Sequence, residues 1–258
     1  MAFVSQSQEN TMRNLQRYLQ DVANARRHEL LPYIFHVTGA QVQTGPFTGI
    51  MLIPRYMWGD GDTAAKLMGV YEDELHDFVE QAIAQEPDLV INVGSAEGYY
   101  SVGFARRLPT VKVIAVDIDP RAAGIVRDTA TANQLTNLEA ITHMVDHAWL
   151  EQQCQQPTKP LLIFDCEGAE LDLLDPAKVN SLLKCSVMVE CHDCMNPVIT
   201  DTLVSRFQST HDIQQVSQTY KDSYQFDFLQ HLSDCDKWAL VHEGRPSTMS
   251  WLYMVPKK

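Results

Sequence analysis

The most informative chemical feature of this 258-residue sequence is a glycine-containing turn that is followed by an acidic residue. Residues 90–100 read VINVGSAEGYY, so Gly94 and Gly98 stand where an apolar run gives way to a helical pattern. Glycines at such a junction let the backbone turn sharply and let a ligand approach the helix N-terminus. The next apolar run ends in Asp117, where an acidic side chain can accept hydrogen bonds from both hydroxyls of an adenosine ribose. The combination predicts a nucleoside site.

A purely structural interpretation of the same residues is a tight turn followed by a helix cap. In that interpretation Gly94 and Gly98 only shape the turn, while Asp117 and Asp119 only cap the helix that begins at Pro120. The glycine loop and the acidic residue occur in the order that a nucleoside site requires, which favours the functional interpretation.

The spacing within the loop bears on the kind of nucleotide. A dinucleotide fingerprint has the form G-x-G-x-x-G, whereas Gly94 and Gly98 here enclose Ser95, Ala96 and Glu97. A carboxylate at Glu97 would oppose a pyrophosphate. The small residues of the loop instead suit a cationic sulfonium nucleoside, and nothing in the loop requires phosphate.

Further polar residues follow two apolar runs later in the chain. Asp165 ends the run at 161–165 and Glu167 follows it, while Glu190 lies near the end of the run at 186–191 and His192 follows that run. If both runs are neighbouring strands, these side chains meet at the edge where open α/β sheets bind ligands. Methyl transfer from a sulfonium needs alignment and removal of a proton from the acceptor, and a carboxylate or His192 could be the base. The predicted catalytic residues are Asp165, Glu167, Glu190 and His192.

Two alternatives for these acidic residues stay open. Glu167 and Glu170 could compensate the N-terminus of a helix instead of taking part in catalysis. Asp165, Glu190 and Asp193 could also hold Mg²⁺, because carboxylate oxygens are its preferred protein ligands. The CxxC at 191–194 lacks a second pair of ligands at a suitable spacing, which disfavours structural zinc.

The elements that must position these residues alternate regularly. Short apolar runs predict five strands at 89–94, 111–117, 138–145, 161–165 and 186–191, with helical segments near 98–108, 120–134, 147–155, 168–183 and 196–208. Strands that alternate with helices form a parallel sheet, and two later runs at 211–220 and 250–256 predict an antiparallel pair at one edge. The predicted fold is α/β and Rossmann-like, with a seven-stranded, mostly parallel sheet and helices on both faces.

The first third of the chain predicts a helical and hairpin extension. Apolar residues at helical spacing predict a helix from Asn10 to Leu31, and two short strands are expected at 33–42 and 48–53. An aromatic loop at 54–62 and a helix at 70–85 follow. We therefore divide the chain into residues 1–85, a lid or dimer surface, and residues 86–258, the cofactor-binding domain. The segment 220–250 is expected either to cover the substrate or to pack on the last helices.

The loop resembles motif I of class I S-adenosylmethionine-dependent methyltransferases, E/D-x-G-x-G-x-G, with Asn92 and Ala96 as departures. Residues 164–170, FDCEGAE, resemble the D-x-E-G-x-E segment of FkbM-type methyltransferases, and the resemblance covers roughly residues 67–195. It implies that the cofactor is S-adenosyl-L-methionine, that Asp117 binds its ribose, that Asp146 lies near the adenine and that Tyr71 and Glu72 cover the cofactor. The cofactor-binding residues that it implies are Gly94, Ser95, Ala96, Glu97, Gly98, Tyr99, Asp117, Ile118 and Asp146.

The amino-acid composition limits the kinds of partner that we expect the protein to bind. With 20 basic and 33 acidic residues the formal net charge is −13, which disfavours nucleic acid, and no run of 18 apolar residues predicts a membrane span. The six cysteines are few and unevenly spaced, which indicates a reduced, cytoplasmic protein.

The predicted function is methyl transfer to a hydroxyl, or second to an amide nitrogen, of a small molecule, sugar or peptide. Two alternatives remain: an NAD-dependent oxidoreductase and a non-catalytic nucleoside-binding regulator. The sequence leaves open the acceptor, the role of Mg²⁺ and whether the protein is a homo-oligomer.

Overall fold

A computed structural model of the chain describes residues 6–57 and 62–258, and its side chains from Asn14 onward except Gln16. The strands are β1 (Leu89–Val93), β2 (Lys112–Asp117), β3 (Leu138–Thr142), β4 (Pro160–Phe164), β5 (Ser186–Cys191), β6 (His211–Ser217) and β7 (Ser250–Pro256). The α-helices are α1 (Gln6–Thr38), α2 (Thr63–Met68), α3 (His76–Ala84), α4 (Tyr99–Arg107), α5 (Pro120–Ala132), α6 (His147–Cys154), α7 (Glu170–Leu173), α8 (Ile199–Phe207) and α9 (Asp234–Val241). Short 3₁₀ turns lie at Asp73–Leu75, Asn180–Lys184 and Asp227–Leu229.

The seven strands form one sheet in the order β3-β2-β1-β4-β5-β7-β6. The first five are parallel, and β7 runs antiparallel to both of its neighbours, β5 and β6. The predicted fold class and the antiparallel edge pair are therefore confirmed. In this register Val93 is opposite Val116 on one side and Phe164 on the other, so the turns that leave β1, β2 and β4 meet at one edge of the sheet.

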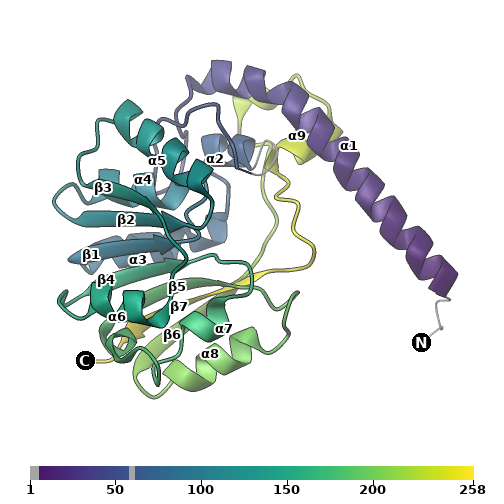
Figure 1. Cartoon of the computed structure of the whole chain (residues 1–258). Coiled ribbons are helices and arrows are strands. Elements are labelled where there is room, and N and C mark those ends of the chain that lie inside the picture. Colours follow the sequence, from purple (N-terminus) through teal and green to yellow (C-terminus); the bar gives the residue numbers. More distant parts are fainter. Residues whose placement is uncertain (1–5, 58–61) are drawn as a thin grey trace.

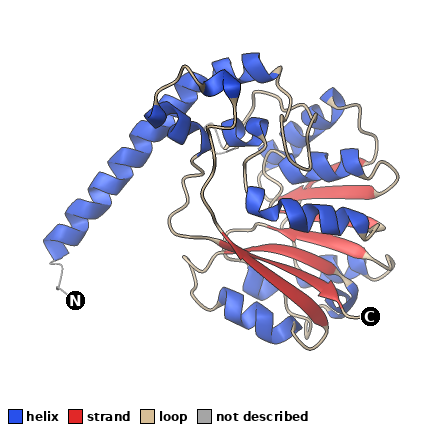
Figure 2. Cartoon of the chain, turned by 180° about the vertical axis from the view of Figure 1, so that it is seen from behind, coloured by secondary structure: helices blue, strands red, loops and turns tan. Residues whose placement is uncertain are grey.

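Helices cover both faces of the sheet, which Figure 2 shows from behind. Neighbouring residues of β1 point to opposite faces: Val90 packs in a core with α3 and α4, and Ile91 packs in a second core with α6 and α8. This alternation is the period-two pattern of a strand that is buried on both sides. The first core also contains Leu31 and Ile34 of α1, so the N-terminal extension packs on the same apolar face as α3 and α4.

The prediction of two short strands at 33–42 and 48–53 is wrong. Helix α1 continues to Thr38, because Leu30, Leu31 and Ile34 form one buried helical face that outweighs the strand propensity of the neighbouring aromatic residues. Of the expected hairpin only a single antiparallel bridge is present, between Gln41 and Met51.

Two predicted helices are shorter than expected. In place of the helix at 70–85 the structure has a 3₁₀ turn at Asp73–Leu75 and then α3, because Glu72 is left-handed with a φ of 47°. The helix at 168–183 ends after four residues of α7, since Pro176 cannot continue a helix. In the aromatic loop at 54–62, Trp58, Gly59 and Gly61 lie outside the described residues.

The N-terminal part of α1 projects away from the sheet domain, whereas its C-terminal part lies beside α9 (Figure 1). Arg26 of α1 forms an ion pair of 2.6 Å with Asp236 of α9. The projecting part exposes four apolar side chains at helical spacing: Leu15, Tyr18, Leu19 and Val22. No helix among the described residues is both long and apolar enough to cross a membrane.

Candidate functional site

The turn after β1 has the backbone shape that its glycines permit. Gly94 and Gly98 have φ values of 76° and 89°, in the left-handed region where a side chain is unfavourable. A Cβ atom at Gly94 would lie 1.7 Å from the backbone oxygen of Asp165, so only glycine lets the turns after β1 and β4 pack together. This contact places the predicted cofactor loop directly beside the first predicted catalytic residue.

Asp117 is joined to this loop. Its carboxylate accepts a hydrogen bond from the backbone N–H of Ala96 at 3.0 Å and another from that of Asp119 at 2.9 Å. Helix α5 is capped by Asp119, whose carboxylate accepts from the N–H of Arg121. The capping alternative thus applies to Asp119, and Asp117 faces the loop as predicted. Each oxygen of Asp117 accepts one of these bonds, and a carboxylate oxygen has room for another donor.

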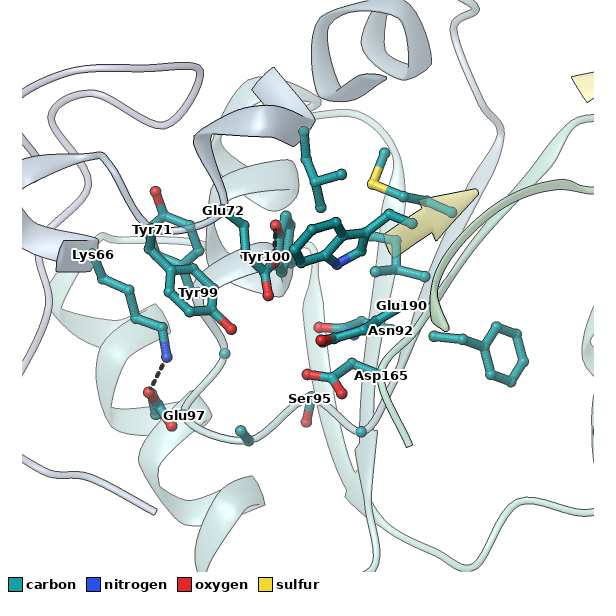
Figure 3. Close-up of a pocket in the computed structure, with 18 residues that line it drawn as sticks. Lys66, Tyr71, Glu72, Asn92, Ser95, Glu97, Tyr99, Tyr100, Asp165 and Glu190 are labelled. Atoms are coloured by element: carbon teal, nitrogen blue, oxygen red, sulfur yellow. Dashed lines mark hydrogen bonds and ion pairs between the residues drawn. The ribbon is translucent and has the colours of Figure 1, made fainter. Parts of the chain in front are cut away.

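A cavity lies beside the loop (Figure 3). Polar groups in its wall come from α2, the turn at 71–75 and the ends of β1, β4 and β5, so segments far apart in sequence build it together. The lining residues are Lys66, Tyr71, Glu72, Leu75, Asn92, Gly94, Ser95, Ala96, Glu97, Gly98, Tyr99, Tyr100, Ile163, Phe164, Asp165, Met188, Glu190 and Trp251. Six of the nine predicted cofactor residues, 94–99, are among them.

The carboxylate of Glu97 is balanced by a buried cation. Lys66 Nζ lies 2.5 Å from Glu97 Oε1, and each side chain is about nine-tenths buried. Burial alone would raise the pKa of Glu97, but the charge and hydrogen bond of Lys66 lower it below its usual value. The loop therefore carries no uncompensated negative charge, and the repulsion of a pyrophosphate that we expected from Glu97 is largely offset.

The other end of the cavity holds a network of buried charges. Arg245, from the segment 220–250, pairs with both Glu72 and Glu190, and the hydroxyl of Tyr100 donates to Glu72. Oε2 of Glu190 has no hydrogen-bond partner among the described residues, although the side chain is only 2% exposed. Burial and the charge of Asp165 raise the pKa of Glu190 well above its usual value.

Asp165, Glu167 and His192 meet beyond the ends of β4 and β5, as predicted. His192 Nε2 lies 3.6 Å from both Asp165 Oδ1 and Glu167 Oε2. On the other side of the ring, Nδ1 lies 2.7 Å from Oε1 of Glu170, which is fully buried. Burial would lower the pKa of His192, but the bond to Glu170 and the charge of Glu190 raise it to about 9. Burial and the charge of Glu72 raise the pKa of Asp165 to about 7.

Compensation of a helix N-terminus, the alternative role expected for Glu170, is only part of what this residue does. It is the first residue of α7, and it accepts a 3.2 Å hydrogen bond from the N–H of Gly168. Its main contact, however, is His192. Glu167 has a left-handed φ of 54° and a side chain that is 74% exposed, so it faces the mouth of the site.

Three predicted residues, Asp117, Ile118 and Asp146, do not line the cavity and lie at the ends of β2 and β3. Ile118 is 71% exposed beside Asp117, and Met144 is 78% exposed on the neighbouring turn. Asp146 is exposed and caps α6 by accepting a 2.8 Å hydrogen bond from the N–H of Trp149. The structure thus places two exposed apolar side chains next to the residue predicted to bind ribose.

The predicted Mg²⁺ ligands do not all converge. Asp193 accepts hydrogen bonds from the N–H and hydroxyl of Thr200, the shorter at 2.5 Å. Potential ligand atoms within 4.8 Å of one another are instead those of Asp165, Glu190 and His192. Of the CxxC cysteines, Cys191 is buried and Cys194 is exposed.

A second cavity adjoins the first, because five residues line both: Lys66, Tyr71, Ala96, Glu97 and Asp165. Its outer wall is formed by α1 and by the end of the segment 220–250, including Glu243, Arg245, Pro246 and Met249. This segment therefore covers the site, and its residues Phe226 and Leu229 also pack in the core.

Sequence reasoning missed Lys66, Tyr100 and Trp251 as parts of the site. The sequence did contain a sign of Lys66, because it is the single charged residue in the segment TAAKLM, which the structure shows to be a buried helix. Trp251 comes from β7 and reaches the cavity only because β7 inserts beside β5.

No protein-family model and no curated protein matches the sequence. Among solved structures, an rRNA methylase from Streptococcus thermophilus is similar at 11% identity, with a TM-score of 0.48 over 71% of this chain and 96% of that one. A precorrin-6Y C5,15-methyltransferase from Geobacter metallireducens has 8% identity and a TM-score of 0.45, covering 70% and 89%. A precorrin 8w decarboxylase from Methanobacterium thermoautotrophicum has 14% identity and a TM-score of 0.46, covering 70% and 89%.

Proposed function

We propose that this protein transfers a methyl group from S-adenosyl-L-methionine to a hydroxyl group of a small molecule, sugar or peptide, with an amide nitrogen as the second choice. The observation that carries the proposal is the junction of three turns: Gly94 packs on the backbone of Asp165, and Ala96 of the same loop is bonded to Asp117. A nucleoside held by Asp117 would therefore have its other end beside Asp165.

The shape and charge of the site support this cofactor. Asp117 offers a carboxylate to ribose hydroxyls, and the exposed apolar side chains of Ile118 and Met144 offer a surface for an adenine ring. The sulfonium is a cation, and Asp165 and Glu190 at the far end of the loop supply negative charge. Asp146, an exposed cap of α6, is assigned to the adenine edge.

Asp165 is the proposed proton acceptor. Its carboxyl group lines both cavities, and its pKa of about 7 is suited to a base that works near neutral pH. His192 is a weaker candidate because its raised pKa keeps it protonated, so we assign it with Glu167 to the binding of the acceptor at the mouth. Glu190 lines the same cavity as Asp165 and pairs with Arg245, and it is assigned as the second candidate for the base.

The FkbM-type subclass is part of the proposal. The segment D-x-E-G-x-E supports it, because each of its four defining residues has a separate place: Asp165 lines the cavity, Glu167 faces the mouth, Gly168 has a φ of 98° and Glu170 holds His192.

We further propose that residues 1–85 act as a lid on the cofactor-binding domain 86–258. Lys66, Tyr71 and Glu72 of this extension form a wall of the cavity, which supports the expected cover. The dimer surface that we considered would be the projecting part of α1, whose apolar side chains are exposed. The acceptor is proposed not to be nucleic acid, since acidic groups outnumber basic ones in both cavity walls. The cytoplasmic location stays a prediction from the cysteine pattern.

Calorimetry with S-adenosylhomocysteine and NAD on the same preparation tests the cofactor. We expect S-adenosylhomocysteine to bind in the micromolar range and NAD to show no saturable heat. Because Lys66 balances the charge of Glu97, that charge no longer argues against a pyrophosphate. The calorimetric comparison therefore decides between the two cofactors. Binding of NAD alone would favour the oxidoreductase. Binding of S-adenosylhomocysteine with no methyl transfer to any acceptor from a hydroxyl and amine library would favour a nucleoside-binding regulator.

A further inference from the structure

The ends of β4 and β5 bring three donor groups of different chemistry together. A carboxylate oxygen of Asp165, a carboxylate oxygen of Glu190 and a ring nitrogen of His192 all lie within 4.8 Å of one another. Glu190 and His192 are buried, and Asp165 is open to the cavity with a side chain that is 41% exposed. A small ion could thus reach the group from the cavity and be enclosed on its other sides by protein.

The orientation of His192 is imposed by a residue behind it. Glu170 holds Nδ1 at 2.7 Å, and this leaves Nε2 directed toward Asp165 and Glu167, each 3.6 Å away. A carboxylate that binds one ring nitrogen while the other faces a group of carboxylates is the usual arrangement behind a metal-bound histidine. Methyl transfer itself does not require this device.

A separate observation concerns the second carboxylate oxygen of Glu190. Oε2 of Glu190 is buried and has no hydrogen-bond partner among the described residues, although Oε1 pairs with Arg245. Buried carboxylate oxygens without a partner are costly, so such an atom in a cavity wall calls for a cation or a donor. In Figure 3 the side chains of Glu190 and Asp165 approach the same part of the cavity.

The charges around the group are compatible with a dication. Arg245 is shared among Glu72, Glu190 and Glu243, so it is outnumbered by the carboxylates that it contacts. Asp165 and Glu167 have no basic partner apart from His192 among the described ion pairs. The Coulomb balance therefore leaves negative charge on the side that faces the cavity.

We propose that Asp165, Glu190 and His192 form a binding site for a divalent transition-metal ion, with Glu170 as the residue that orients His192. The donor set of two oxygens and one imidazole nitrogen favours Mn²⁺, Fe²⁺ or Zn²⁺ over Mg²⁺, which prefers oxygen ligands alone. The site excludes Asp193, which is bound to Thr200. A metal here would lie where the acceptor hydroxyl is proposed to bind, and it could lower the pKa of that hydroxyl.

The test measures metal binding on the full chain after removal of metal with a chelator. Equilibrium dialysis and the electron paramagnetic resonance signal of Mn²⁺ report binding without any need for an acceptor. We expect one Mn²⁺ per chain, Zn²⁺ competing for the same site, and Mg²⁺ binding at least tenfold more weakly than Mn²⁺. Absence of Mn²⁺ and Zn²⁺ binding at 100 µM, or Mg²⁺ binding as tightly as Mn²⁺, would overturn the proposal.

Variants of the proposed ligand residues test where the metal ion binds. Glu190→Gln and His192→Gln should each weaken Mn²⁺ binding at least tenfold, whereas the matched control Asp193→Asn should bind as the wild type does. Since Glu190 is buried and its variant could fail to fold, Asp165→Asn at the more exposed ligand provides a second test with the same expected loss. Unchanged binding in His192→Gln and Asp165→Asn would remove both residues from the site and overturn the proposal. Affinity for S-adenosylhomocysteine, measured on each preparation without metal, separates failure of this site from failure of the proposed cofactor.

Discussion

Glu170, the first residue of α7, and His192, which follows β5, form a buried pair in which Oε1 and Nδ1 are 2.7 Å apart, although the two residues are 22 positions apart in sequence. Glu170 is the hydrogen-bond partner of Nδ1 among the described residues, so the pair fixes both the ring plane and the direction of Nε2. In the absence of metal, the pair also keeps His192 protonated near neutral pH.

This pair should make stability depend on pH in a predictable direction. The pKa of His192 is raised from 6.5 to about 9 in the folded protein, so its contribution is fully present below pH 6.5 and is lost as pH rises through 9. We expect His192→Gln to unfold on the order of 2 kcal/mol more easily than the wild type at pH 6, with the gap closing by pH 10. Urea unfolding of metal-free protein at several pH values measures it. The exposed His36 provides the control variant His36→Gln, which should leave the profile unchanged, and a gap that is the same at pH 6 and pH 10 would refute the assignment.

Asp117→Ala should weaken S-adenosylhomocysteine binding by about 1.5–3 kcal/mol, because hydrogen bonds to a charged acceptor are lost and the loop loses its bond at Ala96. The control is Asp119→Ala, which removes the cap of α5 and should cost about 1 kcal/mol of stability while leaving the affinity within a factor of three. Calorimetry on both variants decides whether Asp117 belongs to the site, since an Asp117→Ala protein that binds like the wild type would exclude it.

Lys66→Met should destabilise the fold by about 3–5 kcal/mol, because it leaves the carboxylate of Glu97 buried without a partner. The double variant Lys66→Met/Glu97→Met should recover most of that loss, since two apolar side chains need no partner. Chemical unfolding of the two variants and of Glu97→Met completes the cycle. Equal stability of the single and double variants would mean that the pair contributes little.

Asp165→Asn should reduce turnover about 10²-fold or more while it keeps affinity for S-adenosylhomocysteine, if Asp165 accepts the acceptor's proton. Activity of the wild type should rise with pH through about 7, because the base must be ionised, and that step should be missing in the variant. Turnover against pH on an acceptor found in the library screen measures both effects. A variant with full turnover per folded molecule would remove Asp165 from catalysis.

Ala96→Gly should raise the free energy of unfolding by about 1 kcal/mol, because Ala96 adopts a φ of 44°, where a Cβ atom is unfavourable. The same change at the exposed helical residue Ala25 should have the opposite sign and lower stability by roughly 0.5–1 kcal/mol. Thermal and urea unfolding of the two variants would show the difference, and a destabilised Ala96→Gly protein would contradict the strain at this position.

The sheet was predictable because each of its strands carries a local signal. The β1 and β4 runs are short and apolar except for Asn92, as is typical of strands buried on both faces, and the glycines at 94 and 98 mark the turn that follows β1. The convergence of Asp165 and His192 followed from the rule that parallel strands end at one edge. The N-terminal strands were not predictable, since the buried face of Ile34 is decided by tertiary packing and not by local propensity.

The amino-acid sequence by itself determined which turns carry chemical groups and where the cofactor loop begins, because glycine geometry and strand polarity are local properties. Only the tertiary structure decided which charges meet. Lys66 pairs with Glu97, which is 31 residues away, and Arg245 pairs with Glu190, which is 55 residues away. Asp193 is hydrogen-bonded to Thr200, so His192 takes its place beside Asp165 and Glu190. Buried ions depend on partners that chain topology brings together, so their pairing has no signature in sequence spacing.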